Sequence, residues 1–126
     1  MVKVLLLMVL CHIIDDFVMQ PICLSKLKQR EWWKNNIKFE KMYEDDYKTA
    51  LFIHALSWSI MISLPVMFLT SLHQELIFGF VILNAIVHYI VDDIKANELK
   101  INLETDQKYH FAQILIYWLC VIVLTR

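Results

Sequence analysis

The chain has 126 residues, of which 59% are hydrophobic, and its mean hydropathy is +0.52. This composition is far more apolar than that of a typical soluble domain of the same size, and it favours a membrane protein with a single domain. The formal net charge is only -1. No basic surface of the kind that binds nucleic acid stands out, so we expect no nucleic-acid partner.

Four apolar blocks run along the chain, each close to the roughly 20 residues that an α-helix needs to cross a bilayer. Glycine occurs only once and proline twice, so residues that break helices are rare. The sequence predicts an all-α fold with one integral membrane domain over residues 1–126. Its four transmembrane helices, at about 2–20, 49–70, 75–92 and 106–125, form an antiparallel bundle. Because the third and fourth blocks are short, a soluble bundle with buried helices is the alternative.

The connection between the first two predicted helices, residues 25–48, mixes charged residues with Trp32, Trp33, Tyr43 and Tyr47. Tryptophan and tyrosine favour the depth of the lipid headgroups, and lysine side chains can reach from an apolar surface to water. We interpret this connection as one or two interfacial helices in contact with the lipid bilayer. A solvated loop is the alternative interpretation.

Basic residues set the predicted orientation in the inner or plasma membrane. The opposite side of the chain offers only Lys3 and Arg126, whereas the first and third connections carry Lys26, Lys28, Arg30, Lys34, Lys38, Lys41, Lys48, Lys95, Lys100 and Lys108. By the positive-inside rule, both charged connections face the cytoplasm and both termini face outward.

Histidine and aspartate residues recur at the predicted cytoplasmic end of every helix. His12 with Asp16, His88 with Asp92, and Asp106 with His110 are each separated by four residues, so each pair shares one helix face. Antiparallel helices can turn these faces toward one another. Mixed imidazole and carboxylate ligands suit Zn, Mn or Fe. We therefore predict one or two divalent transition-metal ions bound by His12, Asp16, His54, His88, Asp92, Asp106 and His110.

Single polar residues in apolar helices also have structural explanations. A histidine can bond to a neighbouring carbonyl, and Asp106 is favourable at the helix N-terminus that Thr105 would cap. For Asp15 and Asp93 we prefer neutralisation by a nearby lysine, Lys26 or Lys95, and we expect His73 at the surface of a short outer connection. The cluster as a whole is different, because independent structural residues have no reason to share one depth.

These residues fall into four ordered motifs that cover nearly the whole chain. They read His12-x-x-x-Asp16-Phe17-x-x-Gln20 followed by Lys26, then His54, then His88-x-x-x-Asp92-x-x-Lys95, then Asp106-Gln107-x-x-His110. The pattern resembles an uncharacterised family of small bacterial and phage membrane proteins, known only as a domain of unknown function. Its motifs are similar to those of membrane-bound metal-dependent hydrolases. The resemblance implies metal ligands and a hydrolase activity but supplies no substrate.

One position departs from the family pattern. The family tends to carry a second histidine one turn after the first in the second helix, and this chain has Trp58 there. The resemblance therefore argues against a complete second metal site.

The first functional hypothesis is a membrane-embedded hydrolase that cleaves a phosphate ester, lipid-linked or a nucleotide, at the cytoplasmic leaflet. A bound metal lowers the pKa of a water molecule and polarises the scissile oxygen. Asp16, His54 and Asp106 would complete a second ion or act as general base. The anionic lipid or phosphate substrate would be held by Lys26, Lys95, Gln20 and Gln107.

A metal-stabilised protein without catalytic activity is the alternative hypothesis. In that case the ion would only hold the helices together, and residues 25–48 would bind a membrane partner, for example as part of a phage factor that acts on a host membrane protein. An ion or proton pathway fits less well, because the outer half of each helix offers almost no polar residues. The sequence is compatible with an oligomer.

Overall fold

The computed structural model describes residues 1–37 and 40–126, so the basic residue Lys38 lies outside the described residues. The described residues form helices and short connections, which confirms the all-α fold. In chain order the elements are α1 (Val2–Ile13), the π-helix η1 (Ile14–Met19), α2 (Ile22–Leu27), α3 (Arg30–Asn36), α4 (Glu40–Tyr43), α5 (Asp46–Leu69), α6 (Gln74–Ala96) and α7 (Leu103–Leu124).

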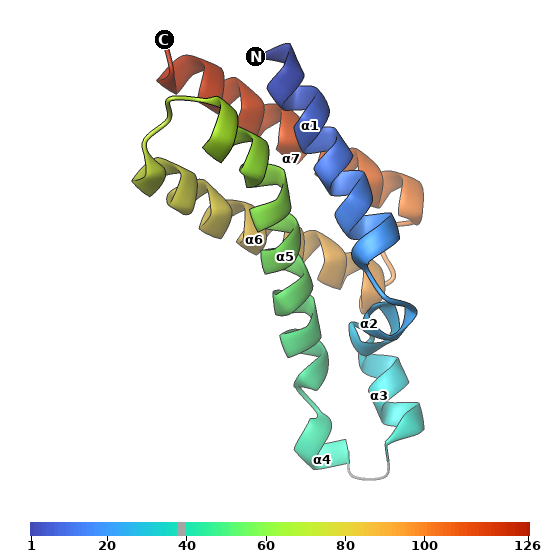
Figure 1. Cartoon of the computed structure of the whole chain (residues 1–126). Helices are drawn as coiled ribbons and strands as arrows, with labels where there is room; N and C mark the ends of the chain where they lie inside the picture. Colours follow the sequence, from blue (N-terminus) through green and yellow to red (C-terminus); the bar gives the residue numbers. More distant parts are fainter. Residues whose placement is uncertain (38–39) are drawn as a thin grey trace.

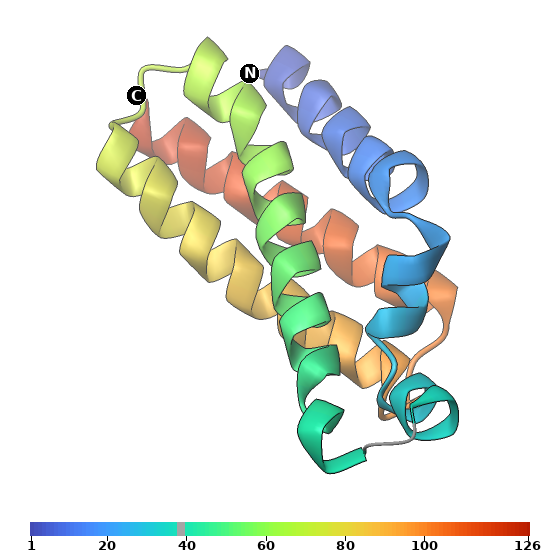
Figure 2. The ribbon, with the colours of Figure 1, turned by 60° about the horizontal axis from the view of Figure 1, so that its bottom comes forward.

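Four of these helices form the body of the protein. α1 packs against α5 and α7, and α6 packs against the same two helices. Both termini and the α5–α6 connection lie at one end of the body, and α2 to α4 lie at the other (Figures 1 and 2). Asn97, just after α6, accepts the Arg30 N–H at 2.7 Å and donates to the Lys28 carbonyl at 3.1 Å. These bonds fix α2 and α3 beside the end of α6.

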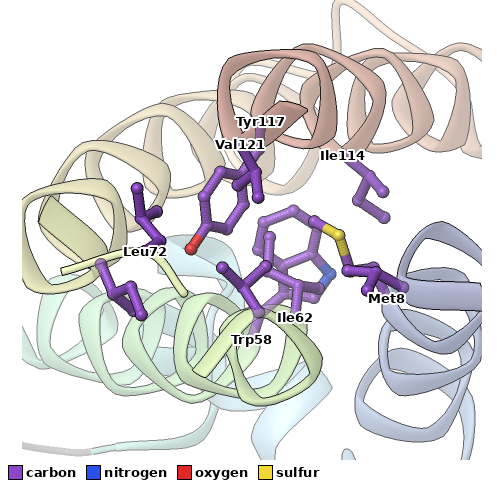
Figure 3. Packing of buried hydrophobic residues seen from close by; sticks show 10 residues of the cluster. Met8, Trp58, Ile62, Leu72, Ile114, Tyr117 and Val121 are labelled. Carbon is purple, nitrogen blue, oxygen red and sulfur yellow. The ribbon is translucent and has the colours of Figure 1, made fainter. Parts of the chain in front are cut away.

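Apolar side chains fill the half of the body that is nearer the termini. Met8, Ile62 and Tyr117 point from three helices into this interior beside Trp58 (Figure 3). The Ser59 hydroxyl donates to the Val81 carbonyl at 2.6 Å and joins α5 to α6. Among the described residues, no buried charged side chain lies in this half, which argues against a polar pathway through the whole protein.

Three helices are long and apolar enough to cross a membrane: the segment Lys41–Leu69, which includes α5, and α6 and α7. This finding is consistent with membrane localisation. α1 has only 12 residues before it passes into η1, fewer than the roughly 20 of a typical span. The fourth predicted span, the antiparallel membrane bundle and the orientation remain predictions.

The helices differ from the predicted ranges mainly at the end that carries the polar residues. α6 continues to Ala96 and therefore includes Lys95. α7 begins at Leu103 and is capped by Asn102, whose side-chain oxygen accepts the Thr105 N–H at 2.9 Å. Thr105, the predicted N-cap, therefore lies within the first turn of α7.

Cysteine labelling in membranes tests the fourth span. If α1 and η1 together cross the bilayer, Lys3→Cys reacts from the same side as Ser71→Cys, and Lys100→Cys reacts from the cytoplasm. The background variant has serine in place of Cys11, Cys23 and Cys120. Reaction of Lys3→Cys and Lys100→Cys from the same side would contradict a fourth span, and reaction of Lys100→Cys from outside would overturn the orientation.

Candidate metal centre

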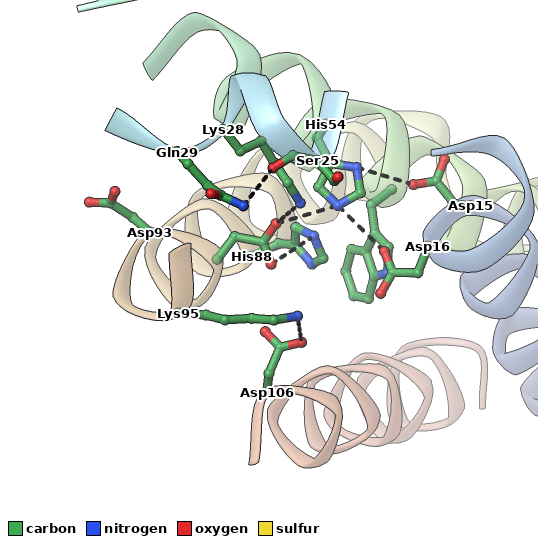
Figure 4. A network of polar contacts seen from close by, with 12 residues as sticks. Asp15, Asp16, Ser25, Lys28, Gln29, His54, His88, Asp93, Lys95 and Asp106 are labelled. Carbon is green, nitrogen blue, oxygen red and sulfur yellow. Dashed lines mark hydrogen bonds and ion pairs between the residues drawn. The ribbon is translucent and has the colours of Figure 1, made fainter. Parts of the chain in front are cut away.

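A cluster of histidine and aspartate side chains lies between the four body helices, on the side of the apolar core away from the termini. Several of its members point toward one another in Figure 4. The cluster contains all seven residues predicted as metal ligands, together with one further aspartate: His12, Asp15, Asp16, His54, His88, Asp92, Asp106 and His110.

Asp92 of α6 lies at the centre of this cluster. Its Oδ1 atom is 3.5 Å from His110 Nε2 and 3.7 Å from His88 Nε2. Its Oδ2 atom is 2.6 Å from Lys28 Nζ and 3.4 Å from His54 Nε2. Since residues four apart share a helix face, α6 directs His88 and Asp92 into the same interior. The two oxygens of one carboxylate thus connect α6 to α2, α5 and α7.

Two further carboxylates flank the Asp92 centre. Asp16 Oδ1, from η1, is 3.4 Å from His54 Nε2. Asp106 Oδ1, from the first turn of α7, is 3.3 Å from His110 Nε2. The other Asp106 oxygen accepts a hydrogen bond from Lys95. In each of these two carboxylates, one oxygen therefore faces an imidazole ring.

Six buried polar atoms of the cluster have no hydrogen-bond partner among the described residues. They are Oδ1 of Asp16, Oδ1 of Asp106, and both ring nitrogens of His88 and of His110. An unsatisfied buried polar group costs about 1–3 kcal/mol, and an ion bound in this place could satisfy several of these six atoms at once. Two donors bound to one tetrahedral metal ion lie about 3.4 Å apart. Asp92 Oδ1 and His110 Nε2, which belong to one candidate group, lie 3.5 Å apart, close to that value.

The charges of the cluster also favour a bound cation. Of the described lysines, two place their ammonium groups against the four aspartates, namely Lys28 and Lys95. With neutral imidazoles, the cluster carries an excess of two negative charges. Burying unneutralised charge in a low-dielectric interior is costly, and one divalent ion would offset this excess.

Within the described part of the chain, two groups of residues could hold a metal ion. His88, Asp92 and His110 form one group, and Asp16, His54 and His88 form the other, with the ligand atoms of each group within 4.8 Å of one another. Because His88 belongs to both, the two groups compete for it. The group around Asp92 is entirely buried and contains both histidines with unpaired nitrogens. Three protein ligands with an open fourth position are typical of catalytic zinc sites.

His12 lies in the cluster, but its ring nitrogens are already engaged. The Trp58 indole N–H donates to His12 Nδ1 at 2.7 Å. His12 Nε2 therefore carries the proton and donates to Gln107 Oε1 at 3.0 Å. Trp58 also stacks on the His88 ring, with centroids 4.2 Å apart. Both ring nitrogens of His12 thus have hydrogen-bond partners in this arrangement, and its place among the metal ligands stays a prediction.

Asp15 is part of the cluster, which differs from the sequence-based interpretation that Lys26 neutralises it. Its side chain is 2% exposed, it accepts a 2.7 Å hydrogen bond from Ser57, and it lies 3.7 Å from His54 Nδ1. The π-helix η1 carries two consecutive aspartates to different partners. Such π-helical segments are frequent at functional sites. Asp15 faces the Nδ1 atom of His54, and the Nε2 atom of the same ring faces Asp16 and Asp92.

A partly open cavity of about 460 Å³ lies beside the cluster. Three of the residues predicted to bind substrate line it, namely Gln20, Lys95 and Gln107. Lys26 is exposed and is not among the lining residues, whereas Lys28 is buried and lines the cavity. The sequence pattern indicated a lysine after the first motif but could not show which one turns inward.

Two residues left out of the predicted site lie apart from it. His73 precedes α6 and is exposed, as expected. Asp93 accepts a 2.7 Å hydrogen bond from Asn97, which takes the place of the predicted neutralisation by Lys95.

Fold and site together define an all-α protein with three helices able to cross a membrane and a buried candidate metal centre. The model of the family described as "Protein of unknown function (DUF3307)" matches residues 4–126, so the chain belongs to this family. No curated protein and no solved structure matches the chain. The family description assigns no activity, so the function has to be argued from the site.

Elemental analysis of purified protein tests the metal centre. We expect about one equivalent of a transition metal in the wild type, and its loss in His88→Ala and His110→Ala, because each change removes a buried ligand. His12→Ala should keep the metal with an affinity weakened by about 10- to 100-fold, the usual cost of losing a group that positions a ligand.

His73→Ala, which removes an exposed histidine outside the cluster, is the matched control. A wild-type protein without stoichiometric metal would contradict the assignment. So would a loss of metal in His73→Ala equal to that in His88→Ala.

Proposed function

We propose that the protein is a metal-dependent hydrolase of phosphate esters whose site opens toward the cytoplasmic leaflet of a membrane. The observation that supports this proposal most strongly is the set of unpaired buried atoms around Asp92, including both ring nitrogens of His88 and His110. These atoms lie beside a cavity that also exposes two lysines to a ligand. Metal ligands next to cationic groups suit an anionic substrate.

His88, Asp92 and His110 would hold the ion. Histidine and carboxylate ligands suit Zn, Mn or Fe, and such an ion supplies Lewis acidity and lowers the pKa of a bound water. The second candidate group consists of Asp16, His54 and His88, so it competes with the first group for His88. His12 accepts a hydrogen bond from Trp58. We therefore favour one ion, with Asp16 and His54 serving other roles.

Asp106 is placed to act as general base. Its Oδ1 atom has no hydrogen-bond partner among the described residues and lies 3.3 Å from His110 Nε2, while its other oxygen is held by Lys95. In the proposed reaction the attacking water gives a proton to this carboxylate and its oxygen bonds to phosphorus. The bond from phosphorus to the ester oxygen breaks, and the alcohol leaves with a proton.

His54 is the group best placed to give that proton to the leaving alcohol. Its Nε2 atom faces the cavity side of the cluster between Asp16 and Asp92, at 3.4 Å from each. Its Nδ1 atom faces Asp15. An imidazole oriented by a carboxylate on one nitrogen and open to the substrate on the other is a recurring arrangement for proton transfer.

Lys28 and Lys95 are proposed to bind the phosphate. Both line the cavity, and each already donates to a carboxylate of the cluster. An ammonium group has three donors, so each lysine can keep its aspartate and still donate to a phosphate oxygen. Lys28 thereby takes the role that the sequence analysis assigned to Lys26.

One observation favours the alternative without catalysis. The group Asp16, His54 and His88 draws its side chains from η1, α5 and α6, so a single ion in this group would hold these three elements together. In this case α2 to α4 would serve to bind a membrane partner. Chelation would then lower thermal stability, but no phosphate ester would be turned over.

Steady-state kinetics on phosphate esters tests the hydrolase. Asp92→Asn should abolish turnover, and Lys28→Met should lower kcat/KM by about 10²-fold or more, the typical effect of removing one preorganised charged donor. Lys26→Met is the matched control, because this exposed lysine does not line the cavity. Equal effects of Lys26→Met and Lys28→Met would contradict the placement of the phosphate. Bound metal with no turnover on any ester would support the alternative.

A further inference from the structure

The cavity beside the metal centre has an outer wall that differs from its inner wall. The inner wall carries the charged residues of the cluster, whereas the outer wall includes four apolar side chains that are each more than half exposed: Phe17, Ile22, Leu99 and Leu103. They come from two segments that lie side by side: η1 with α2, and the connection from α6 to α7 with the first residue of α7 (Figure 2). We call these four residues the apolar rim.

Leu99 is the most unusual member of the apolar rim. Among the described residues it is the one non-glycine residue with a positive φ, at 54°, and its side chain is 80% exposed. The left-handed conformation is unfavourable for a leucine. Its two neighbours, Glu98 and Lys100, form an ion pair at 2.7 Å, so Leu99 lies between two charged residues. A strained backbone that presents an exposed leucine to a cavity points to a ligand.

We propose that the substrate is an amphiphile, a phosphate ester of a hydrocarbon chain, and this inference rests on the proposed function. Its phosphate reaches Lys28 and Lys95 at the inner wall, and its chain lies along the apolar rim. The volume of about 460 Å³ is within the range of small-molecule sites. A membrane lipid with a phosphate headgroup has this combination of charge and chain.

The apolar rim is poorly suited to a nucleotide. Recognition of a base uses aromatic stacking together with hydrogen bonds to the edge of the base. Ile22, Leu99 and Leu103 provide neither, and Phe17 is the single aromatic residue that lines the cavity within the described part of the chain.

Binding of non-hydrolysable alkyl phosphonates tests this inference without turnover. Butyl, octyl and dodecyl phosphonate are titrated calorimetrically into the metal-loaded full chain in nanodiscs, and the signal of empty nanodiscs is subtracted. We expect the affinity to rise by up to about four-fold per added methylene, the value for complete removal of a methylene from water.

The rim variant Leu99→Asn/Leu103→Gln should lose this dependence on chain length and still bind butyl phosphonate with the wild-type affinity. Asparagine tolerates the left-handed conformation, so the backbone at position 99 is kept. Ile22→Gln, on a different element, should reduce the dependence in the same way. Met42→Gln is the matched control, because Met42 is an exposed apolar residue of α4 that does not line the cavity.

The outcomes separate this inference from the proposed function. The proposal of an amphiphilic substrate would be overturned by equal affinities for all three phosphonates. It would also be overturned if the dependence on chain length were unchanged in both the rim variant and Ile22→Gln. If a nucleotide or butyl phosphate were hydrolysed as efficiently as dodecyl phosphate, the amphiphilic substrate would be contradicted, but the proposed hydrolase function would be supported. Binding that depends on chain length and on the rim, without turnover of any alkyl phosphate, would support the amphiphilic ligand and contradict the hydrolase.

Discussion

Asp92 carries the interaction on which the rest of the structure depends, because its two oxygens face different groups. One oxygen lies near His88 and His110, and the other bonds to Lys28 and lies near His54. A carboxylate buried at this depth is unfavourable unless positive charge compensates it. Lys28 provides part of that charge and also brings α2 over the cavity. An excess of negative charge remains, and the ring nitrogens of His88 and His110 have no hydrogen-bond partner among the described residues. A bound metal ion would offset the charge and occupy ring nitrogens.

The apolar and polar halves of the body have complementary roles. Met8, Ile62 and Tyr117 pack around Trp58 in the apolar half, which fixes the relative positions of the helices that carry the candidate metal ligands. Trp58 belongs to both halves, since its ring stacks on His88 and its indole N–H donates to His12. A single tryptophan therefore couples the packing of the core to the geometry of the site. The same residue supports the proposal of one ion, because its indole N–H occupies His12 Nδ1.

Much of this arrangement could be predicted from the sequence, because helix periodicity fixes which residues share a face. The pairs His88 with Asp92 and Asp106 with His110 meet as expected. Three features could not be predicted. The π-helix η1 brings Asp15 inward beside Asp16, and regular α-helical spacing gives no sign of this. The choice of Lys28 over Lys26 depends on where the short helix α2 ends. The hydrogen bond from Trp58 to His12 is a tertiary contact that the sequence motif does not reveal. For this reason the motif indicated a metal ligand at His12.

X-ray absorption spectroscopy of the metal in the purified wild-type protein tests the central claim most directly, because it reports the chemical identity of the ligands. The account predicts a first shell of nitrogen and oxygen atoms at about 2.0–2.2 Å with outer-shell scattering from two imidazole rings. His88 and His110 would supply these rings, and the Asp92 carboxylate would supply oxygen. A shell that contains sulfur, or one without imidazole scattering, would contradict the account.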